Sequence, residues 1–164
     1  MYSKKLNMKD PIYSMPENAL TIALSADHAG YELKTKLLKW LEEQGYQTLD
    51  LGTNSEESVD YPDYGAKLGD AISADKAQCG IAICGSGIGI SIALNRFVQV
   101  RSALCRDVED AKLARQHNNA NVVSLGARKT PFKEACRIVA TFLDTDFEGG
   151  RHERRVEKLG GCAK

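Results

Sequence analysis

The chain has 164 residues, of which 22 are basic and 22 acidic, and 43% are apolar. A chain of this length can bury a core without disulfides or metals, and its balanced charge creates no field that would attract nucleic acid or an anionic membrane. We therefore expect a single folded domain over residues 20–164, preceded by a flexible extension over residues 1–19, with small molecules or proteins as partners.

The cysteines and the apolar segments indicate a cytoplasmic protein. The five cysteines show neither paired nor regular spacing, which is typical of reduced thiols rather than a disulfide scaffold. The longest run of apolar and small residues, 80–94, is too short to cross a membrane. Residues 1–19 carry mixed charges and no apolar run of the kind found in secretory signals.

From Leu20 onward, short apolar runs alternate with longer stretches of helical period, which predicts βα units around a parallel sheet. The predicted strands are residues 20–25, 47–52, 79–84, 100–105 and 121–126. A leucine stripe over residues 33–41 predicts a helix that stops at Gly45, and later helices begin at Asp107 and Pro131. With a basic helical arm at the C-terminus, the pattern predicts a Rossmann-like α/β/α sandwich with helices on both faces of five parallel strands.

Two unusual stretches follow predicted strands. In doubly wound sheets the ligand lies beyond the carboxyl ends of the strands, where "ADHAG" (26–30) and "CGSGIG" (84–89) are expected. The alternating glycines let backbone N–H groups turn toward one cavity, which suits an anion or an oxygen that becomes an oxyanion. Cys84 stands beside those groups, in an environment that favours the reactive thiolate.

Two other interpretations of this stretch stay open. A cysteine that ends a buried strand is often simply a small core residue. The glycines also resemble a dinucleotide-binding turn, with Asp107 about twenty residues on, where a ribose-binding acid is expected. The spacing G-x-G-x-G differs from that motif, however, and Asp107 is better explained as a helix N-cap.

The three histidines have different expected roles. His28 follows Asp27 at a strand end, where the alternative is that Asp27 caps the next helix and His28 is solvated. His117 ends a predicted helix before two asparagines, and His152, flanked by arginines, is expected on the surface. No histidine pair has the spacing of metal ligands, so no metal is implied.

The direction of the predicted helices separates the candidate residues. A crossover helix runs antiparallel to the strands, so His117 should lie at the opposite edge of the sheet from Cys84. The basic tail with Arg151, Arg154 and Arg155 also follows a helix end. If these groups serve the Cys84 cavity, a two-fold partner must bring its own edge over that of the first subunit.

Several motifs together resemble one family. They are "SADHAG", "LGT", "DYPDYG", "ICGSGIGISIALN", "RQHNNANVVSLGAR" and "EGGRHERRVEKL". The chain resembles ribose-5-phosphate isomerase type B, in the family that also contains the galactose-6-phosphate isomerase subunits, over residues 20 to about 160. The resemblance implies interconversion of D-ribose 5-phosphate and D-ribulose 5-phosphate in the pentose phosphate pathway, through an enediolate and without metal or organic cofactor.

The resemblance also implies roles for the glycine turn. Cys84 matches the base that moves a proton between C2 and C1, because Ser91 and its neighbours offer no acid where another branch of the family carries glutamate. Ser86 would shuttle protons between the two substrate oxygens. The backbone that would stabilise the enediolate belongs to Gly85, Gly87, Ile88 and Gly89.

Further positions match ring-opening and binding residues of the family. His117 would open the furanose ring, with Asp27 as its partner across the substrate. The remaining matches are the phosphate ligands His28, Arg128, Arg151 and Arg155 and the substrate contacts Tyr61 and Asn118. The family is similar to a Rossmann-type sandwich that forms homodimers with the active site between subunits, often paired into tetramers.

Two rival functions remain at this point. Within the family, a galactose-6-phosphate or allose-6-phosphate isomerase is the nearest, because pocket length decides between five and six carbons. From another class, the chain would be a non-catalytic phosphosugar- or nucleotide-binding module. The combination of Cys84, Ser86, His117 and Asp27 argues against that module, since binding alone needs no thiol and no ring-opening pair.

Overall fold

The computed structural model describes residues 20–161, so the predicted extension over residues 1–19 and Cys162 lie outside the described residues. The strands are β1 (Thr21–Ala26), β2 (Gln47–Asp50), β3 (Cys79–Cys84), β4 (Ser102–Leu104) and β5 (Val122–Gly126). The α-helices are α1 (Tyr31–Glu43), α2 (Tyr61–Ser73), α3 (Ile88–Leu94), α4 (Val108–Asn118), α5 (Phe132–Asp144) and α6 (Glu153–Gly161), with 3-10 turns η1 (His28–Gly30) and η2 (Gly150–His152). Over this part of the chain no helix is both long and apolar enough to span a membrane.

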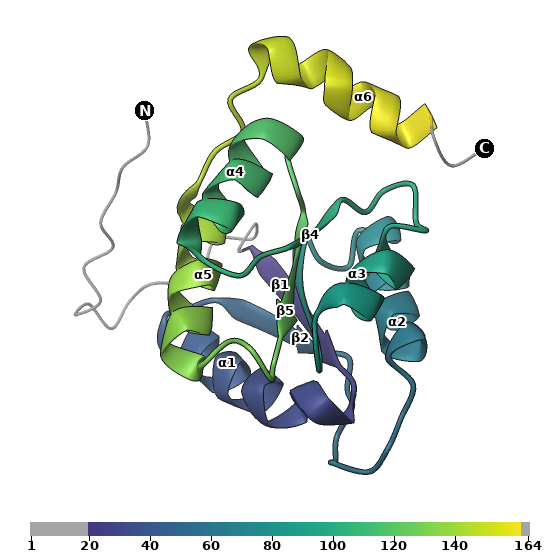
Figure 1. The fold of residues 1–164 in the computed structure, drawn as a ribbon, viewed down its shortest axis with the longest axis vertical. Helices are drawn as coiled ribbons and strands as arrows, with labels where there is room; N and C mark the ends of the chain where they lie inside the picture. The colour runs from purple at the N-terminus through teal and green to yellow at the C-terminus, as the bar shows by residue number, and fades with distance from the viewer. Residues whose placement is uncertain (1–19, 162–164) are drawn as a thin grey trace, which may run out of the picture.

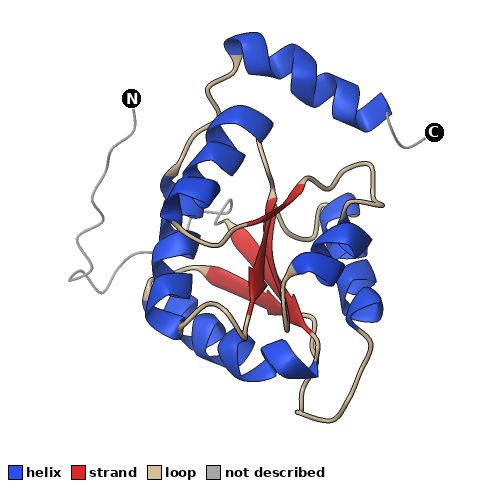
Figure 2. Cartoon of the chain, in the orientation of Figure 1, coloured by secondary structure: helices blue, strands red, loops and turns tan. Residues whose placement is uncertain are grey.

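All strand pairs are parallel, and the sheet order is β2-β1-β3-β5-β4. Helices α1, α4 and α5 cover one face and α2 and α3 the other, while α6 lies apart from both layers (Figures 1 and 2). This confirms the predicted α/β/α sandwich with its C-terminal arm. The chain reverses its direction across the sheet between β1 and β3, so the loops that follow these two strands flank the switch point.

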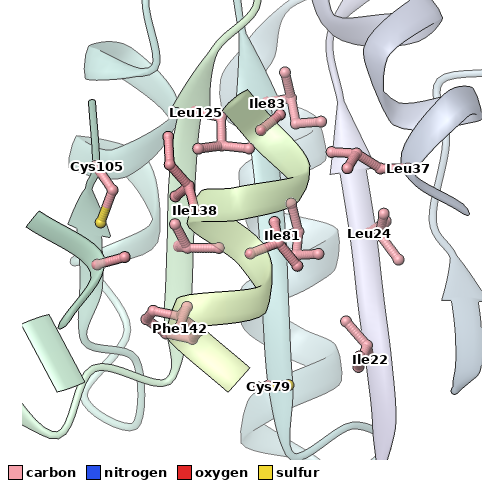
Figure 3. Packing of buried hydrophobic residues seen from close by; sticks show 14 of the residues in the cluster. Ile22, Leu24, Leu37, Cys79, Ile81, Ile83, Cys105, Leu125, Ile138 and Phe142 are labelled. Carbon is pink, nitrogen blue, oxygen red and sulfur yellow. The ribbon is translucent and has the colours of Figure 1, made fainter. Parts of the chain in front are cut away.

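The two faces of the sheet have side chains of different size. Large apolar residues of β1, β3 and β5 pack under α1 and α5, with Leu37, Ile138 and Phe142 on the helices (Figure 3). Because successive residues of a strand point to opposite faces, Ala23, Ala82 and Cys84 lie together under α2 and α3. Cys84 thus occupies the face with small side chains.

Two predicted strands are shorter than expected by at least two residues, and β5 by one. Residues 100–105 form only Ser102–Leu104, because this edge strand has one neighbour, β5, and ends where that pairing ends. β2 stops at Asp50, whose carboxylate accepts hydrogen bonds from Lys34 Nζ at 2.5 Å and from the N–H of Gly52 at 2.9 Å. Lys34 is only 1% exposed, and its ion pair ties the loop after β2 to helix α1.

Candidate active site

A tight glycine turn follows Cys84 at the carboxyl end of β3. The Cys84 Sγ, in a side chain only 3% exposed, accepts a hydrogen bond from the N–H of Gly87 at 3.1 Å. Gly87 has φ +77°, and a Cβ there would lie 2.6 Å from Leu104 Cδ1 and 2.8 Å from the carbonyl carbon of Leu125. Only glycine fits this conformation, so the turn fixes an N–H donor at the sulfur. The N–H of Ile88 donates to the exposed Ser86 Oγ at 3.2 Å.

The other described thiols lie in less favourable surroundings for a thiolate. Burial raises the pKa of Cys79 to about 11, and burial with nearby Asp110 and Asp107 raises the pKa of Cys105 to about 12. Burial also raises the pKa of Cys136. These thiols therefore stay protonated near neutral pH. Cys84 differs from them in that its sulfur accepts a hydrogen bond from a backbone N–H.

Asp27 and His28 stand next to the turn, at the end of β1. The Asp27 N–H donates to Ile83 O at 3.1 Å, and its carboxylate accepts from the N–H of Gly30 at 3.0 Å, which confirms that Asp27 caps the helical turn η1. The alternative in which His28 is simply solvated does not hold. Its Nδ1 lies 3.2 Å from the N–H and 3.1 Å from the carbonyl oxygen of Val59, which fixes the ring against the loop before α2.

Tyr61 and Arg128 frame the turn from two sides. A Cβ on Gly89 would lie 2.6 Å from Tyr61 Cζ, and a Cβ on Gly85 would lie 3.0 Å from Arg128 Nη1, so both side chains rest directly on the turn. The loop after β5 is hydrogen-bonded to the turn through the backbone. The N–H of Arg128 donates to Gly85 O at 3.1 Å, and the N–H of Ala127 donates to Cys84 O at 2.9 Å. The structure therefore brings Asp27 and these residues together at one edge.

A second cluster surrounds His117 at the end of α4. The rings of His117 and His152 are stacked, with centroids 4.4 Å apart and planes 9° from parallel. Glu148 Oε2 lies 3.9 Å from the Nε2 of His117 and 3.6 Å from the Nε2 of His152. The Nε2 of His152 also accepts a hydrogen bond from Arg151 Nε at 3.3 Å. Burial, together with His117, Arg151 and Arg155, lowers the pKa of His152, although Glu148 opposes this.

The predicted surface position of His152 is wrong, because the side chain is only 6% exposed. Gly149 and Gly150 have φ +65° and +54°, and this turn leads the chain through η2 back to the end of α4. The segment is held there by the N–H of Glu148, which donates to Gln116 O at 3.1 Å. Sequence reasoning missed Glu148 and His152, although the glycine pair just before the histidine was a signal for such a turn.

Only some of the residues expected to bind phosphate or open the ring meet at this second cluster, since Asp27, His28 and Arg128 lie at the first one. His117, Asn118 and Arg155 line a cavity of about 200 Å³ together with His152 and the apolar side chains of Val156 and Leu159. Arg151 belongs to this cluster because its Nε donates a hydrogen bond to His152.

Within the described residues, His117, Glu148 and His152 form a group whose possible ligand atoms lie within 4.8 Å of one another. A metal ion lies in the ring plane of each imidazole that binds it. Two stacked, nearly parallel planes do not meet near the rings, so one histidine would have to turn before both could hold one ion. As the side chains stand, this group is arranged to share protons and charge rather than to coordinate a metal.

The two clusters lie at opposite ends of the strands, the first at the carboxyl edge of the sheet and the second at its amino edge. In the pairing of β3 with β5, Cys84 is opposite Gly126 and Gly80 is opposite Val122, while α4 with His117 ends just before β5 begins. The four residue steps from Gly80 to Cys84 span about 13 Å at about 3.3 Å each. One small substrate molecule cannot touch both clusters of a single chain.

A doubly wound parallel sheet with a glycine turn at its switch point is characteristic of α/β proteins that bind small molecules at the carboxyl edge of the strands. The model of the Ribose/Galactose Isomerase family matches residues 22–159, and the chain belongs to that family. This confirms the resemblance predicted from the sequence motifs.

Individual relatives agree with this membership. Ribose-5-phosphate isomerase B of Escherichia coli is 41% identical over 138 residues, 84% of this chain and 93% of that protein. The crystal structure of a ribose 5-phosphate isomerase from Thermotoga maritima matches with 48% identity and a TM-score of 0.85, over 87% of this chain and 98% of that one. A ribose-5-phosphate isomerase B structure from Clostridium thermocellum matches with 43% identity and a TM-score of 0.86, over 87% and 97% of the two chains.

Proposed function

We propose that the chain is an aldose-ketose isomerase that interconverts D-ribose 5-phosphate and D-ribulose 5-phosphate through an enediolate, as a cytoplasmic enzyme of the pentose phosphate pathway. Relatives that match nearly over their full length carry this name. The observation that carries the chemistry is the hydrogen bond from the N–H of Gly87 to Cys84 Sγ at the mouth of the glycine turn. This hydrogen bond places the proposed base next to the backbone N–H groups of the glycine turn.

The isomerisation needs a base for a weakly acidic proton next to a carbonyl and a pocket for the negative oxygen that forms. Cys84 removes the proton from C2 of the open-chain aldose and returns it to C1. The backbone N–H groups of residues 85–89 stabilise the enediolate, and the Ser86 hydroxyl, exposed beside them, moves a proton between O2 and O1. No cofactor takes part in this sequence of steps.

The remaining candidates bind the substrate and open its ring. Arg151 and Arg155 bind the phosphate, because a forked guanidinium matches phosphate oxygens. His28 and Arg128 add to this site from the carboxyl edge. His117 and the buried Asp27 open the furanose ring, and the substrate contacts are Tyr61 and Asn118.

We infer that each active site lies between two copies of the chain, in a homodimer or a dimer of dimers. The separation of about 13 Å along β3 requires the second copy to supply His117 and the arginines to the Cys84 edge. A surface suited to this partner exists. A cleft of about 960 Å³ lies between α6, the segment 95–101 that follows α3, β4 and α4, and the exposed apolar side chains of Val98 and Leu159 line it. Ile88 and Ile92 on α3 are further exposed apolar side chains.

Turnover of the purified protein tests the assignment. Ribose 5-phosphate is expected to yield ribulose 5-phosphate, and a folded protein with no activity on it would contradict the proposal. The matching family description names both ribose and galactose, so six-carbon sugar phosphates are the second candidate substrates. Galactose 6-phosphate and allose 6-phosphate are compared in the same assay by kcat/KM. A higher kcat/KM for either of them would replace ribose 5-phosphate as the substrate.

A further inference from the structure

We propose that Glu148 and His152 are positioning residues for the ring-opening step: they hold the His117 imidazole in one orientation and place a counter-charge beside its transferable proton. This inference rests on the proposed function, in which His117 acts on the furanose ring. It assigns a role to two residues that are neither the base nor phosphate ligands.

Fixed contacts set the orientation of His117. Its ring lies flat against His152, which is 6% exposed and whose Nε2 accepts a hydrogen bond from Arg151 Nε. Glu148 is anchored by its own N–H, which donates to the carbonyl of Gln116, the residue directly before His117. A half-exposed imidazole at a helix end would otherwise turn freely, so the stack and the carboxylate replace several orientations by one.

The two stacked histidines have different surroundings. Two imidazoles with centroids 4.4 Å apart do not both hold a positive charge beside the arginines Arg151 and Arg155. The Arg151 N–H occupies the lone pair of His152 Nε2, and burial further lowers the pKa of His152. His152 is therefore the neutral member, and Glu148 is the negative group within 4 Å of the Nε2 of both rings. The Glu148 carboxylate is thus placed as the counter-charge for a proton that His117 transfers.

The proton has a defined use in ring opening. The bond between C1 and the ring oxygen O4 breaks, and its electron pair goes to O4. O4 takes a proton from His117, while the hydroxyl on C1 gives its proton to the partner's Asp27, so that an open-chain aldehyde forms. A later proton transfer in the opposite sense restores both groups. Without the Glu148 carboxylate the protonated imidazole of His117 has no counter-charge, and the ring opens more slowly.

Glu148→Gln tests this by removing the charge while keeping the shape of the side chain. The kcat and KM for ribose 5-phosphate are measured across pH for wild type, Glu148→Gln and Glu148→Asp, with the exposed Glu109→Gln at the far end of α4 as control. In Glu148→Gln we expect kcat to fall about 10-fold, less than the about 10²–10⁴-fold of losing a catalytic acid, with the alkaline limb of the kcat profile moved to lower pH. Glu148→Asp restores part of kcat, and the control behaves as wild type.

A second substrate separates ring opening from the later chemistry. In ribulose 5-phosphate the phosphate blocks O5, so no furanose forms and the sugar is already open. Exchange of its C1 proton with D₂O therefore needs Cys84 but no ring opening. Glu148→Gln is expected to slow this exchange much less than it slows turnover of ribose 5-phosphate. Equal losses in the two reactions, or an unchanged pH profile, would overturn the proposal.

His152 is tested through its flat ring. His152→Phe keeps a surface for His117 to stack on, so it is expected to retain more kcat than His152→Ala, and equal losses would overturn the role given to His152. A wild-type protein without activity on ribose 5-phosphate would instead contradict the proposed function. Because the wild-type assay comes first, the two failures are distinguishable.

Discussion

Mixing two inactive variants tests whether one active site takes residues from two chains. Cys84→Ala removes the proposed base at the carboxyl edge, and His117→Ala removes the proposed ring-opening group at the other edge. Each variant alone is expected to be nearly inactive. After subunit exchange, for example by dilution from mild denaturant, the mixture is expected to regain activity on ribose 5-phosphate.

The expected recovery follows from the geometry. Along β3 the two edges are about 13 Å apart, so in the proposed dimer the Cys84 of one chain works with the His117 of the other. In a two-fold dimer of the two variants, one site carries both substitutions and the other carries neither. Random exchange makes about half of the dimers mixed, and each of these has one intact site of two, so the mixture should reach about one quarter of wild-type activity.

The control is the double variant Cys84→Ala/His117→Ala. Mixed with Cys84→Ala, it leaves no dimer with an intact thiol and should restore nothing. The proportion of mixed dimers is measured by native mass spectrometry of differently tagged chains. Confirmed mixed dimers without recovered activity would place Cys84 and His117 in the same site of one chain and refute the reasoning from the two edges.

Three further expectations concern single residues and metal. Cys84→Ala should lower the exchange of the substrate C2 proton with solvent about 10²–10⁴-fold in a folded protein. In the wild type, iodoacetamide should alkylate Cys84 before Cys79 and Cys105, because burial keeps those two thiols protonated. An exchange rate near that of the wild type in Cys84→Ala would mean that Cys84 is only a small core residue. Arg155→Ala should weaken binding of ribose 5-phosphate by about 1.5–3 kcal/mol and leave ribose unaffected, with Arg154→Ala as the matched control; equal losses for both sugars would make Arg155 structural. Activity should survive EDTA, and loss that a divalent ion restores would contradict a metal-free reaction.

The sequence was informative wherever a local pattern decides the structure. Apolar runs located every strand of the sheet, and Asp107 caps α4 as its position predicted, with its carboxylate 2.9 Å from the N–H of Asp110. Strand ends were less predictable, because the length of an edge strand depends on its one neighbour. For β4 that neighbour is β5, which pairs with only three of its residues.

The same distinction between local and long-range features holds for the candidate site. The glycine turn and Cys84 are contiguous in sequence, so their neighbourhood could be predicted. The stack of His117 on His152 joins residues from two elements, and a histidine among arginines gives no periodic signal for burial. Lys34 is a similar case: its position on the buried face of α1 is explained only by Asp50, which a different element supplies.

The two loops that hold Cys84 and Arg128 are in contact backbone to backbone, and this limits how the enzyme could change its substrate. A Cβ on Gly126 would lie 2.6 Å from the carbonyl oxygen of Ser86, and the same loops share two backbone hydrogen bonds. An insertion in either loop would disrupt these contacts with the other loop, so neither loop can be lengthened to admit a longer sugar. Space for a sixth carbon must come from the irregular segment 51–60 before Tyr61, or from the partner's edge. Variation among relatives with different substrates should therefore gather in those two places.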